Sequence, residues 1–394
     1  MYLTEQHIIK DSRFKDWCIK AKDLYNQVLY YWRQSIFGNI QYFTEYEIIG
    51  LMQEYNEKCF RALPANTSQQ IIRQLFINIK SWYSANKTYN KYPEKFLGLP
   101  KMPKYKKEMF VLYFTNTQVR LKNGYIHFPK MMNIKPIKTN ISAVQYCRVI
   151  PRNNHFVIEF IYKVEESVKI IENDNIMGID LGLNNLATIV TTNGVSEIIN
   201  GKPLKSINHF YNKRISKLQS LLCKNTHSSK RIERITFCRN QKIKDYIHKA
   251  SKYIIKKAKE LNISKIIIGN NKNWKQEINI GRKNNREFTS IPHSQLINKI
   301  EYKAKLSGIE TIITEESYTS ICSSYDLETV QKHETYLGKR IKRGLFRTNQ
   351  NKYINADANG AINIIRKVAE NIVRKHIDSV RSCVEQPYKI KYFV

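Results

Sequence analysis

Three acidic segments lie far apart along the chain and carry side chains that could hold metal ions. Asp180 stands inside the apolar run IMGIDLG, Glu315 and Glu316 follow the run GIETIIT, and Asp357 lies in NADANGAINII. An ionised carboxylate inside a buried strand destabilises the fold unless a positive charge meets it. Asp180 therefore predicts a positive partner, either elsewhere in the chain or as a bound cation.

Each acid also has a simpler interpretation. Asp180 could end its strand and accept hydrogen bonds from backbone N–H groups. Glu315 and Glu316 could be solvated, and Asp357 is a good N-cap for the helix that follows it. Taken together, the acids favour one shared site, because carboxylates that meet repel one another unless divalent cations lie between them. Oxygen ligands suit Mg²⁺ or Mn²⁺, and two such ions can promote hydrolysis of a phosphodiester.

The order of the predicted elements would bring these acids together. From about residue 171, IMGIDLG predicts a strand, and NLATIVTT-NG-VSEII predicts a hairpin that turns at Asn193–Gly194. A long helical stretch at about 205–260, the strand SKIIIG, a helix stopped at Gly308, the strand GIETIIT and a last helix near Asp357 follow. This β-β-β-α-β-α-β order is that of the RNase H-like fold. In that fold the first strand, a later strand end and the last helix converge at one rim.

The N-terminal part of the chain predicts different structure. Apolar residues recur every three to four positions in the first hundred residues, which indicates helices. Prolines in KYPEKFLGLPKMPKYKK then mark a boundary. Residues 108–166 alternate in polarity and contain the hairpin signal Asn123–Gly124, so they predict a small β-barrel or sandwich. We therefore expect a multidomain α/β protein.

The charge of the chain points to a polyanionic partner. Its 394 residues include 66 Lys and Arg against 33 Asp and Glu, which gives a formal net charge of +33. Hydrophobic residues make up 42% of the chain, as in a globular protein. Nucleic acid is the expected partner. An anionic membrane is the alternative, but no basic amphipathic helix or lipidation signal stands out.

Three groups of residues are the candidates for contact with nucleic acid. The alternatives are a flexible linker for the first group below, a buried Trp in a turn for the second and a solvated hairpin for the third. The candidates are Lys101, Lys104, Lys106 and Lys107; Lys272, Trp274 and Lys275; and Lys339, Arg340, Lys342, Arg343 and Arg347.

The cysteines and the hydropathy pattern suggest a compartment. Seven scattered cysteines without a CxxC pair, and a start without the apolar region of a signal peptide, predict reduced cytosolic thiols. The chain contains no run of about 18 apolar residues, so its sequence predicts no transmembrane helix. We expect a cytoplasmic protein that associates with the nucleoid when it binds DNA, and no membrane partner.

Four motifs carry a resemblance to a known family. GIDLGLNNLAT, ESYTS and NADANGAINI, with PKYKK ahead of the β region, resemble TnpB, the transposon-encoded RNA-guided nucleases related to type V CRISPR effectors. The resemblance implies a guide RNA from the transposon end and cleavage of double-stranded DNA beside a short transposon-adjacent motif. Guide pairing would read the target sequence.

The resemblance also implies a division of the chain into domains. A helical recognition domain would come first, followed by a β-barrel wedge domain and a RuvC nuclease domain with an insertion. A possible N-terminal strand of the first domain would join the barrel. The expected ranges are 1–100, 101–170, 171–381 with the insertion at 319–355, and a C-terminal tail at 382–394.

The first departure from the family concerns the middle acid. The family usually carries it where this chain has Gly269 and Asn270, with no carboxylate before Glu277. Some relatives, including the eukaryotic Fanzor proteins, look as if they use a Glu just before a Tyr-Thr-Ser-like segment. Glu316 occupies the similar position in this chain. We therefore predict that the catalytic residues and ligands of two Mg²⁺ or Mn²⁺ ions are Asp180, Glu316 and Asp357, with Glu315 as the second choice.

The second departure concerns zinc. The family often has a four-cysteine zinc ribbon in the insertion, where this chain has only Cys322 and His333. Two ligands cannot close a tetrahedral site, so we predict no zinc. Two other functions remain alternatives: a nuclease-dead RNA-guided DNA-binding repressor, and a guide-free RuvC-type structure-specific nuclease.

Overall fold

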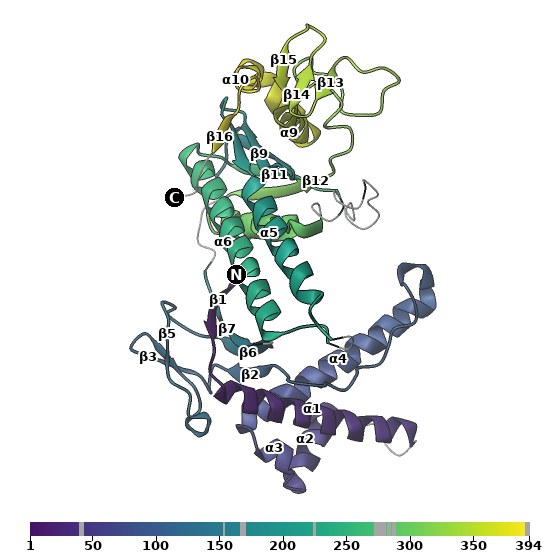
Figure 1. Cartoon of the computed structure of the whole chain (residues 1–394), viewed down its shortest axis with the longest axis vertical. Coiled ribbons are helices and arrows are strands. Elements are labelled where there is room, and N and C mark those ends of the chain that lie inside the picture. Colours follow the sequence, from purple (N-terminus) through teal and green to yellow (C-terminus); the bar gives the residue numbers. More distant parts are fainter. Residues whose placement is uncertain are drawn as a thin grey trace. The chain divides into compact units, whose positions relative to one another are not determined.

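The structure is a computed structural model, and it describes residues 1–38, 43–152, 154–165, 171–223, 226–271, 281, 285 and 289–390. The chain folds into two compact units, Met1–Glu166 and Ser167–Val394 (Figure 1). The expected multidomain α/β class is therefore confirmed. No helix among the described residues has the length and apolar character needed to cross a membrane.

Helices and two small sheets make up the first unit. The helices are α1 (Arg13–Phe37), α2 (Glu45–Glu54), α3 (Lys58–Arg61), α4 (Ala65–Lys91) and the short 3₁₀ turns η1 (Pro93–Lys95) and η2 (Lys130–Met132). Helix α1 buries one apolar stripe, which runs from Phe14 to Trp32. Helix α2 begins with a capping box, in which the Thr44 side chain accepts from Glu47 N and the Glu47 side chain accepts from Thr44 N.

The strands of this unit form two separate sheets. The first has the order β1-β7-β6-β2 and the second the order β3-β4-β5. The N-terminal strand pairs antiparallel with β7, and the hairpin between β3 and β4 turns at Asn123–Gly124 with φ angles of +52° and +74°. A closed barrel is not confirmed in the described residues. The strands are β1 (Tyr2–Ile9), β2 (Leu112–Thr115), β3 (Arg120–Lys122), β4 (Tyr125–His127), β5 (Ile137–Lys138), β6 (Tyr146–Arg152) and β7 (His155–Lys163).

Helices and strands of the first unit share one hydrophobic core. Trp32 of α1, Phe76 of α4, Phe114 of β2 and Phe160 of β7 all belong to it. The two predicted N-terminal domains therefore lie together in one compact unit, and a domain boundary near residue 100 stays a prediction.

A six-stranded sheet organises the second unit. Its order is β12-β11-β8-β9-β10-β16; β8, β9 and β10 are antiparallel to their neighbours in the chain, and β11 runs parallel to both β8 and β12. The expected hairpin turns at Gly194, where φ is +79°. The strands are β8 (Ile176–Leu181), β9 (Asn185–Thr191), β10 (Ser196–Asn200), β11 (Lys265–Gly269), β12 (Glu310–Thr314) and β16 (Tyr388–Ile390).

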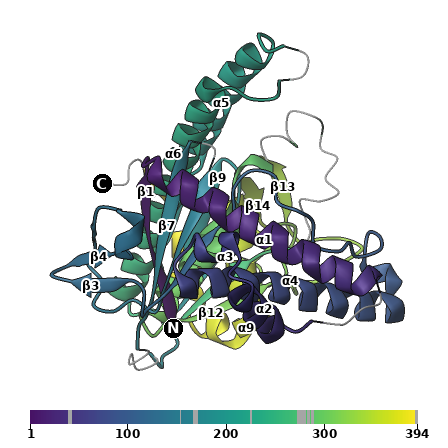
Figure 2. The ribbon, with the colours of Figure 1, turned by 90° about the horizontal axis from the view of Figure 1, so that it is seen from below.

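Two details of this unit differ from the sequence prediction. The segment called a C-terminal tail contributes β16, which pairs parallel with β10. The helical stretch at 205–260 is two helices, α5 (Lys202–Gln219) and α6 (Lys230–Glu260), and α6 begins at an N-cap, Ser229, whose side chain accepts from Ile232 N. The two helices lie side by side (Figures 1 and 2).

The two faces of the sheet have different helical covers. On one face Met177, Ile179 and Leu181 share a core with α6 and α8 (His293–Lys305). On the other, Ile176, Val190 and Ile267 share a core with α9 (Ala356–Lys375). Side chains alternate along a strand, so Asp180 points to the α9 face. The remaining elements are α10 (Ile377–Cys383) and the three-stranded sheet of the insertion, β13 (Lys339–Lys342), β14 (Leu345–Arg347) and β15 (Tyr353–Asn355).

Close contact between β8 and α9 depends on Gly178. A Cβ atom at this position would lie 2.5 Å from the backbone oxygen of Ala361 and 2.5 Å from Cγ1 of Ile365. Helix α9 can therefore approach the strand that carries Asp180 only because residue 178 has no side chain.

Gly178→Ala should destabilise the protein by about 1–3 kcal/mol, because the backbone of α9 must move away from the sheet. Chemical denaturation measures the change in free energy of unfolding. Gly50→Ala on α2 is the matched control, since its Cβ would meet open space, and it should be neutral or slightly stabilising. Equal stability of both variants would contradict the packing described here.

Candidate active site

Three elements of the second unit position the three predicted acids. Asp180 lies on β8, Glu316 follows the end of β12, and Asp357 lies in the first turn of α9. Gly360 lets the Asp180 carboxylate lie against α9, because a Cβ atom at residue 360 would be 3.1 Å from Oδ2 of Asp180. The strand end, the loop after β12 and the helix start thus converge on Asp180.

The pKa of Asp180 depends on the charges of the other two acids. Burial raises the pKa of Asp180 well above its ordinary range, and the negative charges of Glu316 and Asp357 raise it further. Arg340 is the nearby cation that opposes this rise. Glu316, rather than the exposed Glu315, is the glutamate whose charge acts on Asp180.

Glu316 is itself a perturbed carboxyl group. Burial raises its pKa to about 7, and the positive charge of Lys367 opposes the shift. Its buried Oε1 atom has no hydrogen-bond partner. An ionised carboxylate with a buried, unpartnered oxygen is unfavourable unless a positive group meets it.

Glu316 occupies the space that a side chain on Gly269 would need. A Cβ atom at residue 269 would lie 2.5 Å from Oε1 and 2.6 Å from Cγ of Glu316, and 2.5 Å from Cδ1 of Ile364. Gly269 ends β11, whose preceding residue, Ile268, pairs with Ile179 beside Asp180. A carboxylate from the loop after β12 therefore reaches the end of β11, where this chain has no acid of its own.

Several backbone contacts fix the loop that carries Glu316. Asn271 Oδ1 accepts a hydrogen bond from Glu316 N at 2.9 Å, and Thr319 donates to Glu316 O from N at 3.2 Å and from Oγ1 at 2.8 Å. Lys367 Nζ donates to Glu315 O at 3.0 Å, and Tyr318 adopts a left-handed φ of +64°. The turn is therefore held at both ends.

Asp357 does not serve as the N-cap of α9. Asn355 takes that role, because its Oδ1 accepts from the backbone N–H groups of Asp357 and Ala358 at 3.0 and 3.1 Å. The Asp357 carboxylate instead accepts from Asn185 Nδ2 at 2.7 Å and pairs with Arg340 at 3.4 Å. Capping therefore does not explain this acid.

The site combines suitable ligand atoms with an open arrangement. Among the described residues, no three His, Cys, Asp or Glu side chains are grouped closely enough to hold a metal ion as they stand. Metal binding by these acids would require their side chains to draw together. The unpartnered Oε1 of Glu316 and the mutual repulsion of the acids are the features that a cation would relieve.

Sequence reasoning missed the residues that support the acids. Asn185, Asn271 and Lys367 each contact an acid or its loop through a hydrogen bond between residues far apart in the sequence. Gly269, where the family resemblance would place an acid, leaves room for Glu316. A sequence signal existed only for Asn185, which directly follows the GIDLGLN segment.

The residues predicted to contact nucleic acid have mixed environments. Lys106 is half-buried with its ammonium 5.0 Å from the Tyr25 ring centroid, and Arg340 pairs with Asp357. The positions Lys272, Trp274 and Lys275 lie outside the described residues. Contact with nucleic acid stays a prediction for all of them; the exposed ones are Lys101, Lys104, Lys107, Lys339, Arg340, Lys342, Arg343 and Arg347.

Two asparagines of α9 hold the first part of the insertion. Asn359 Oδ1 accepts from the N and Oγ atoms of Ser324 at 2.8 Å, and Asn359 and Asn363 both donate to Cys322 O. His333 Nε2 lies 2.8 Å from Thr329 O. Hydrogen bonds thus order the segment where the family resemblance would place a zinc ribbon, and the absence of zinc stays a prediction.

Comparison with known proteins finds similarity to TnpB-like and Cas12f-type proteins. A model described as a probable transposase, OrfB of IS605, matches residues 159–275, and a model of the Cas12f1-like TNB domain matches residues 293–364. The TnpB-like protein ORF457 of Acidianus two-tailed virus is 26% identical over 51% of this chain and 44% of its own length. These matches support a relation of the chain to the TnpB and type V effector family.

A further relative and a solved structure are also similar to this chain. The CRISPR-associated endodeoxyribonuclease Cas12f2 of Micrarchaeota archaeon is 27% identical over 68% of this chain and 51% of its own length. The chain spans about half the length of the curated relatives it matches. A solved Cas12f1-sgRNA-target DNA complex aligns with 92% of this chain and 98% of the solved chain, at 18% identity and a TM-score of 0.37.

The raised pKa of Glu316 predicts how pH changes stability in the absence of metal. The folded state holds this proton more tightly than the unfolded state, so the folded protein should lose stability as pH rises from 4.5 through about 7. Glu316→Gln should lack this loss, which is worth up to about 3 kcal/mol. Denaturation in a chelator at pH 5 and pH 8 measures it, and the same pH dependence in both proteins would contradict a buried Glu316 carboxyl.

Proposed function

We propose that this chain is an RNA-guided DNA endonuclease. It would hydrolyse phosphodiester bonds in double-stranded DNA beside a short transposon-adjacent motif, with a guide RNA derived from the transposon end. Similarity to TnpB-like and Cas12f-type proteins supports the guide and the nuclease class, and the Cas12f2 relative, a CRISPR-associated endodeoxyribonuclease, supports endodeoxyribonuclease activity. The net charge of +33 supports extensive contact with nucleic acid.

A RuvC or RNase H-like identity of the second unit is part of this proposal. Its support is the sheet order β12-β11-β8-β9-β10, with the antiparallel strands first in the chain and two parallel strands added on the other side of β8. Helix α9 packs on the strand that carries Asp180, as the convergence of the acids requires.

The observation that carries the proposal is the buried Asp180 beside two further acids. Its pKa is raised by burial and by both Glu316 and Asp357, so the ionised site is unfavourable by itself. The acids supply only oxygen ligands, which suit Mg²⁺ or Mn²⁺. We assign Asp180, Glu316 and Asp357 as the residues that would hold two such ions. When bound, divalent ions can activate a water molecule and stabilise the leaving oxygen of a phosphodiester.

The other side chains of the site would position the acids and the substrate. Asn185 orients the Asp357 carboxylate, and the turn at Asn271 and Thr319 orients Glu316. Arg340 is exposed and close to Asp357, so its guanidinium could bind a backbone phosphate of the DNA strand at the site. Gly269 keeps the space of the middle acid open for Glu316.

Two alternatives remain within the same family of folds. A nuclease-dead, RNA-guided repressor would bind its target without cutting, and a buried group of mutually repelling acids argues against it, because nothing in a purely binding protein would offset that repulsion. A guide-free structure-specific nuclease would cut branched DNA without RNA. The helices and sheets of Met1–Glu166 argue against that function, since such an enzyme has no need of them.

Cleavage of a matched target should depend on both RNA and Glu316. Protein purified with its co-expressed RNA should linearise a matched plasmid in Mg²⁺, and removal of the RNA or of the metal should abolish the product. Glu316→Gln should bind the target and cut at least about a hundredfold more slowly, while the matched control Glu315→Gln should cut normally. Binding without cutting by the wild type would favour the repressor, and RNA-independent cutting of branched DNA would favour the structure-specific nuclease.

Gly269→Ala should impair the same reaction by moving Glu316. The added Cβ atom would overlap the Glu316 carboxylate, so we expect cutting to fall by at least about tenfold while target binding is retained. Gly50→Ala provides the matched control. The pair Gly269→Asp with Glu316→Gly should recover part of the activity, because it places an acid in the same space. Normal cutting by Gly269→Ala would contradict this account of Glu316.

A further inference from the structure

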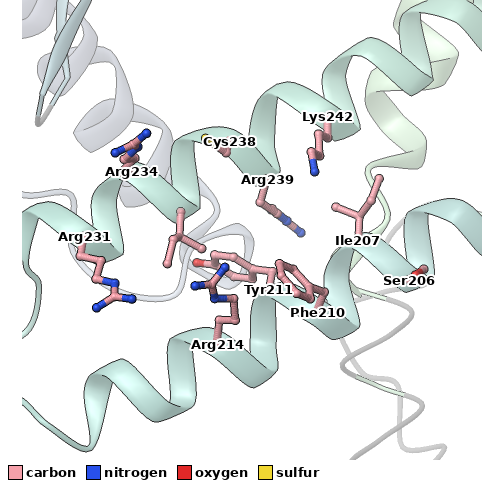
Figure 3. Close-up of a pocket in the computed structure, with 11 residues that line it drawn as sticks. Ser206, Ile207, Phe210, Tyr211, Arg214, Arg231, Arg234, Cys238, Arg239 and Lys242 are labelled. Atoms are coloured by element: carbon pink, nitrogen blue, oxygen red, sulfur yellow. The ribbon is translucent and has the colours of Figure 1, made fainter.

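A cavity of about 650 Å³ lies between α5 and α6, and none of the three acids lines it (Figure 3). Its lining combines two aromatic rings with five cationic side chains: Phe210 and Tyr211, with Arg214, Arg231, Arg234, Arg239 and Lys242. Among the described residues that line it there is no Asp or Glu. The positive net charge of the chain could explain the arginines, but the proposed nuclease chemistry does not explain why aromatic rings lie among them.

Hydrogen bonds fix the inner part of the cavity. Tyr211 Oη lies 3.1 Å from Thr236 Oγ1, which ties the ring from α5 to α6. Arg239 donates to Asn208 Oδ1 from Nε at 2.8 Å and from a terminal nitrogen at 2.6 Å, and its guanidinium carbon is 5.3 Å from the Tyr211 ring centroid. These two groups therefore form a rigid, preorganised floor.

The rim of the cavity is accessible and more weakly held. Phe210 is 58% exposed, so its ring is open to contact with a ligand. The Arg214 guanidinium lies 5.4 Å from the Phe210 ring centroid, and the side chains of Arg231 and Arg234 are exposed on the first turns of α6. Figure 3 shows Phe210, Tyr211 and Arg214 directed into the space between the helices.

We propose that this cavity binds an unpaired nucleotide within a single-stranded nucleic-acid segment. The base would stack on Phe210 beside Tyr211, and the flanking phosphates would contact Arg214, Arg231 and Arg234. Aromatic rings with basic neighbours bind single strands in this way, because each base offers a flat face and each phosphate a negative charge. The volume suits a ligand of nucleotide size.

The chemistry of the lining favours a single strand over the other polyanions. A duplex keeps its bases stacked on one another, so it could satisfy the arginines but could not cover Phe210. The acidic side chains of a peptide could satisfy the arginines, but they offer no flat face to stack on Phe210. This inference does not rest on cleavage at the three acids, because stacking and phosphate contact require neither metal nor hydrolysis.

Cys238 allows a test on the protein without any substitution. Its exposed thiol lines the cavity, whereas the exposed thiol of Cys223 does not. Alkylation by N-ethylmaleimide is followed at both cysteines by mass spectrometry, with a short oligothymidylate, oligouridylate, duplex DNA or inorganic triphosphate added. We expect either single strand to slow alkylation of Cys238 severalfold and to leave Cys223 unchanged, while the duplex and triphosphate have little effect.

The outcomes of this footprint separate the possibilities. Stronger protection by the ribose or the deoxyribose strand supports the proposal and identifies the natural strand as RNA or DNA. Equal protection of Cys238 and Cys223, equal protection by duplex and single strand, or no protection of Cys238 would overturn it. Failure of target cleavage in the same preparation would bear on the nuclease and leave this result intact.

Five variants, compared in two sets, give an independent measurement. Phe210→Ala should weaken oligonucleotide binding by about fivefold or more, as expected for loss of one stacked base, while Phe210→Trp retains it. The control Tyr46→Ala removes a 76% exposed ring from α2 and should have no effect. Arg234→Ala should weaken binding more than Lys256→Ala, which removes the same charge elsewhere on α6. Unchanged binding in Phe210→Ala, together with equal weakening by Arg234→Ala and Lys256→Ala, would show attraction by net charge alone and refute the pocket.

Discussion

The structure of the second unit depends on how a buried carboxylate is tolerated. Asp180 lies on a central strand, where burial and two neighbouring acids raise its pKa well above the ordinary range. Arg340 opposes these effects from the surface, but it also pairs with Asp357. The site is therefore short of positive charge when it is ionised. Divalent cations are the simplest group that could supply it, and this single constraint connects the fold to the proposed chemistry.

The relation between Gly269 and Glu316 shows how one site can be built from a different strand. The ends of β11 and β12 are adjacent in the sheet, since Gly269 pairs with Thr314. A side chain from the loop after β12 can therefore cover the end of β11, provided that residue 269 has no Cβ atom in the way. The unusual turn at Tyr318 and the contacts of Asn271 and Lys367 then hold the carboxylate in place.

Much of the second unit could be predicted from local patterns, and the reasons are physical. Asn-Gly turns fix hairpin geometry, so the hairpin of β9 and β10 was found at Asn193–Gly194. The convergence of the acids followed from element order. The N-cap could not be assigned, because Asn355 and Asp357 are both good caps and only the observed hydrogen bonds decide between them. Strand β16 was missed because three residues carry too little periodicity to identify a strand.

The features that sequence could not give are those made by distant residues. The supporting contact of Asn185 and the fit of Glu316 over Gly269 depend on packing across the sheet. The cavity between α5 and α6 is another case, since its rings and arginines come from two helices that the sequence pattern joined into one. A cavity of this kind can be recognised only when it is known that the stretch forms two helices packed against each other.

The most direct test of the central claim is calorimetric titration of Mg²⁺ at pH 7 in buffers of different ionisation enthalpy, which counts the protons released on binding. Carboxyl groups with raised pKa values should lose protons when a cation meets them, so the wild-type protein should release protons and the release should diminish in Glu316→Gln but not in Glu315→Gln. Binding without proton release, or the same release in all three proteins, would contradict the claim that these buried acids share a cation site.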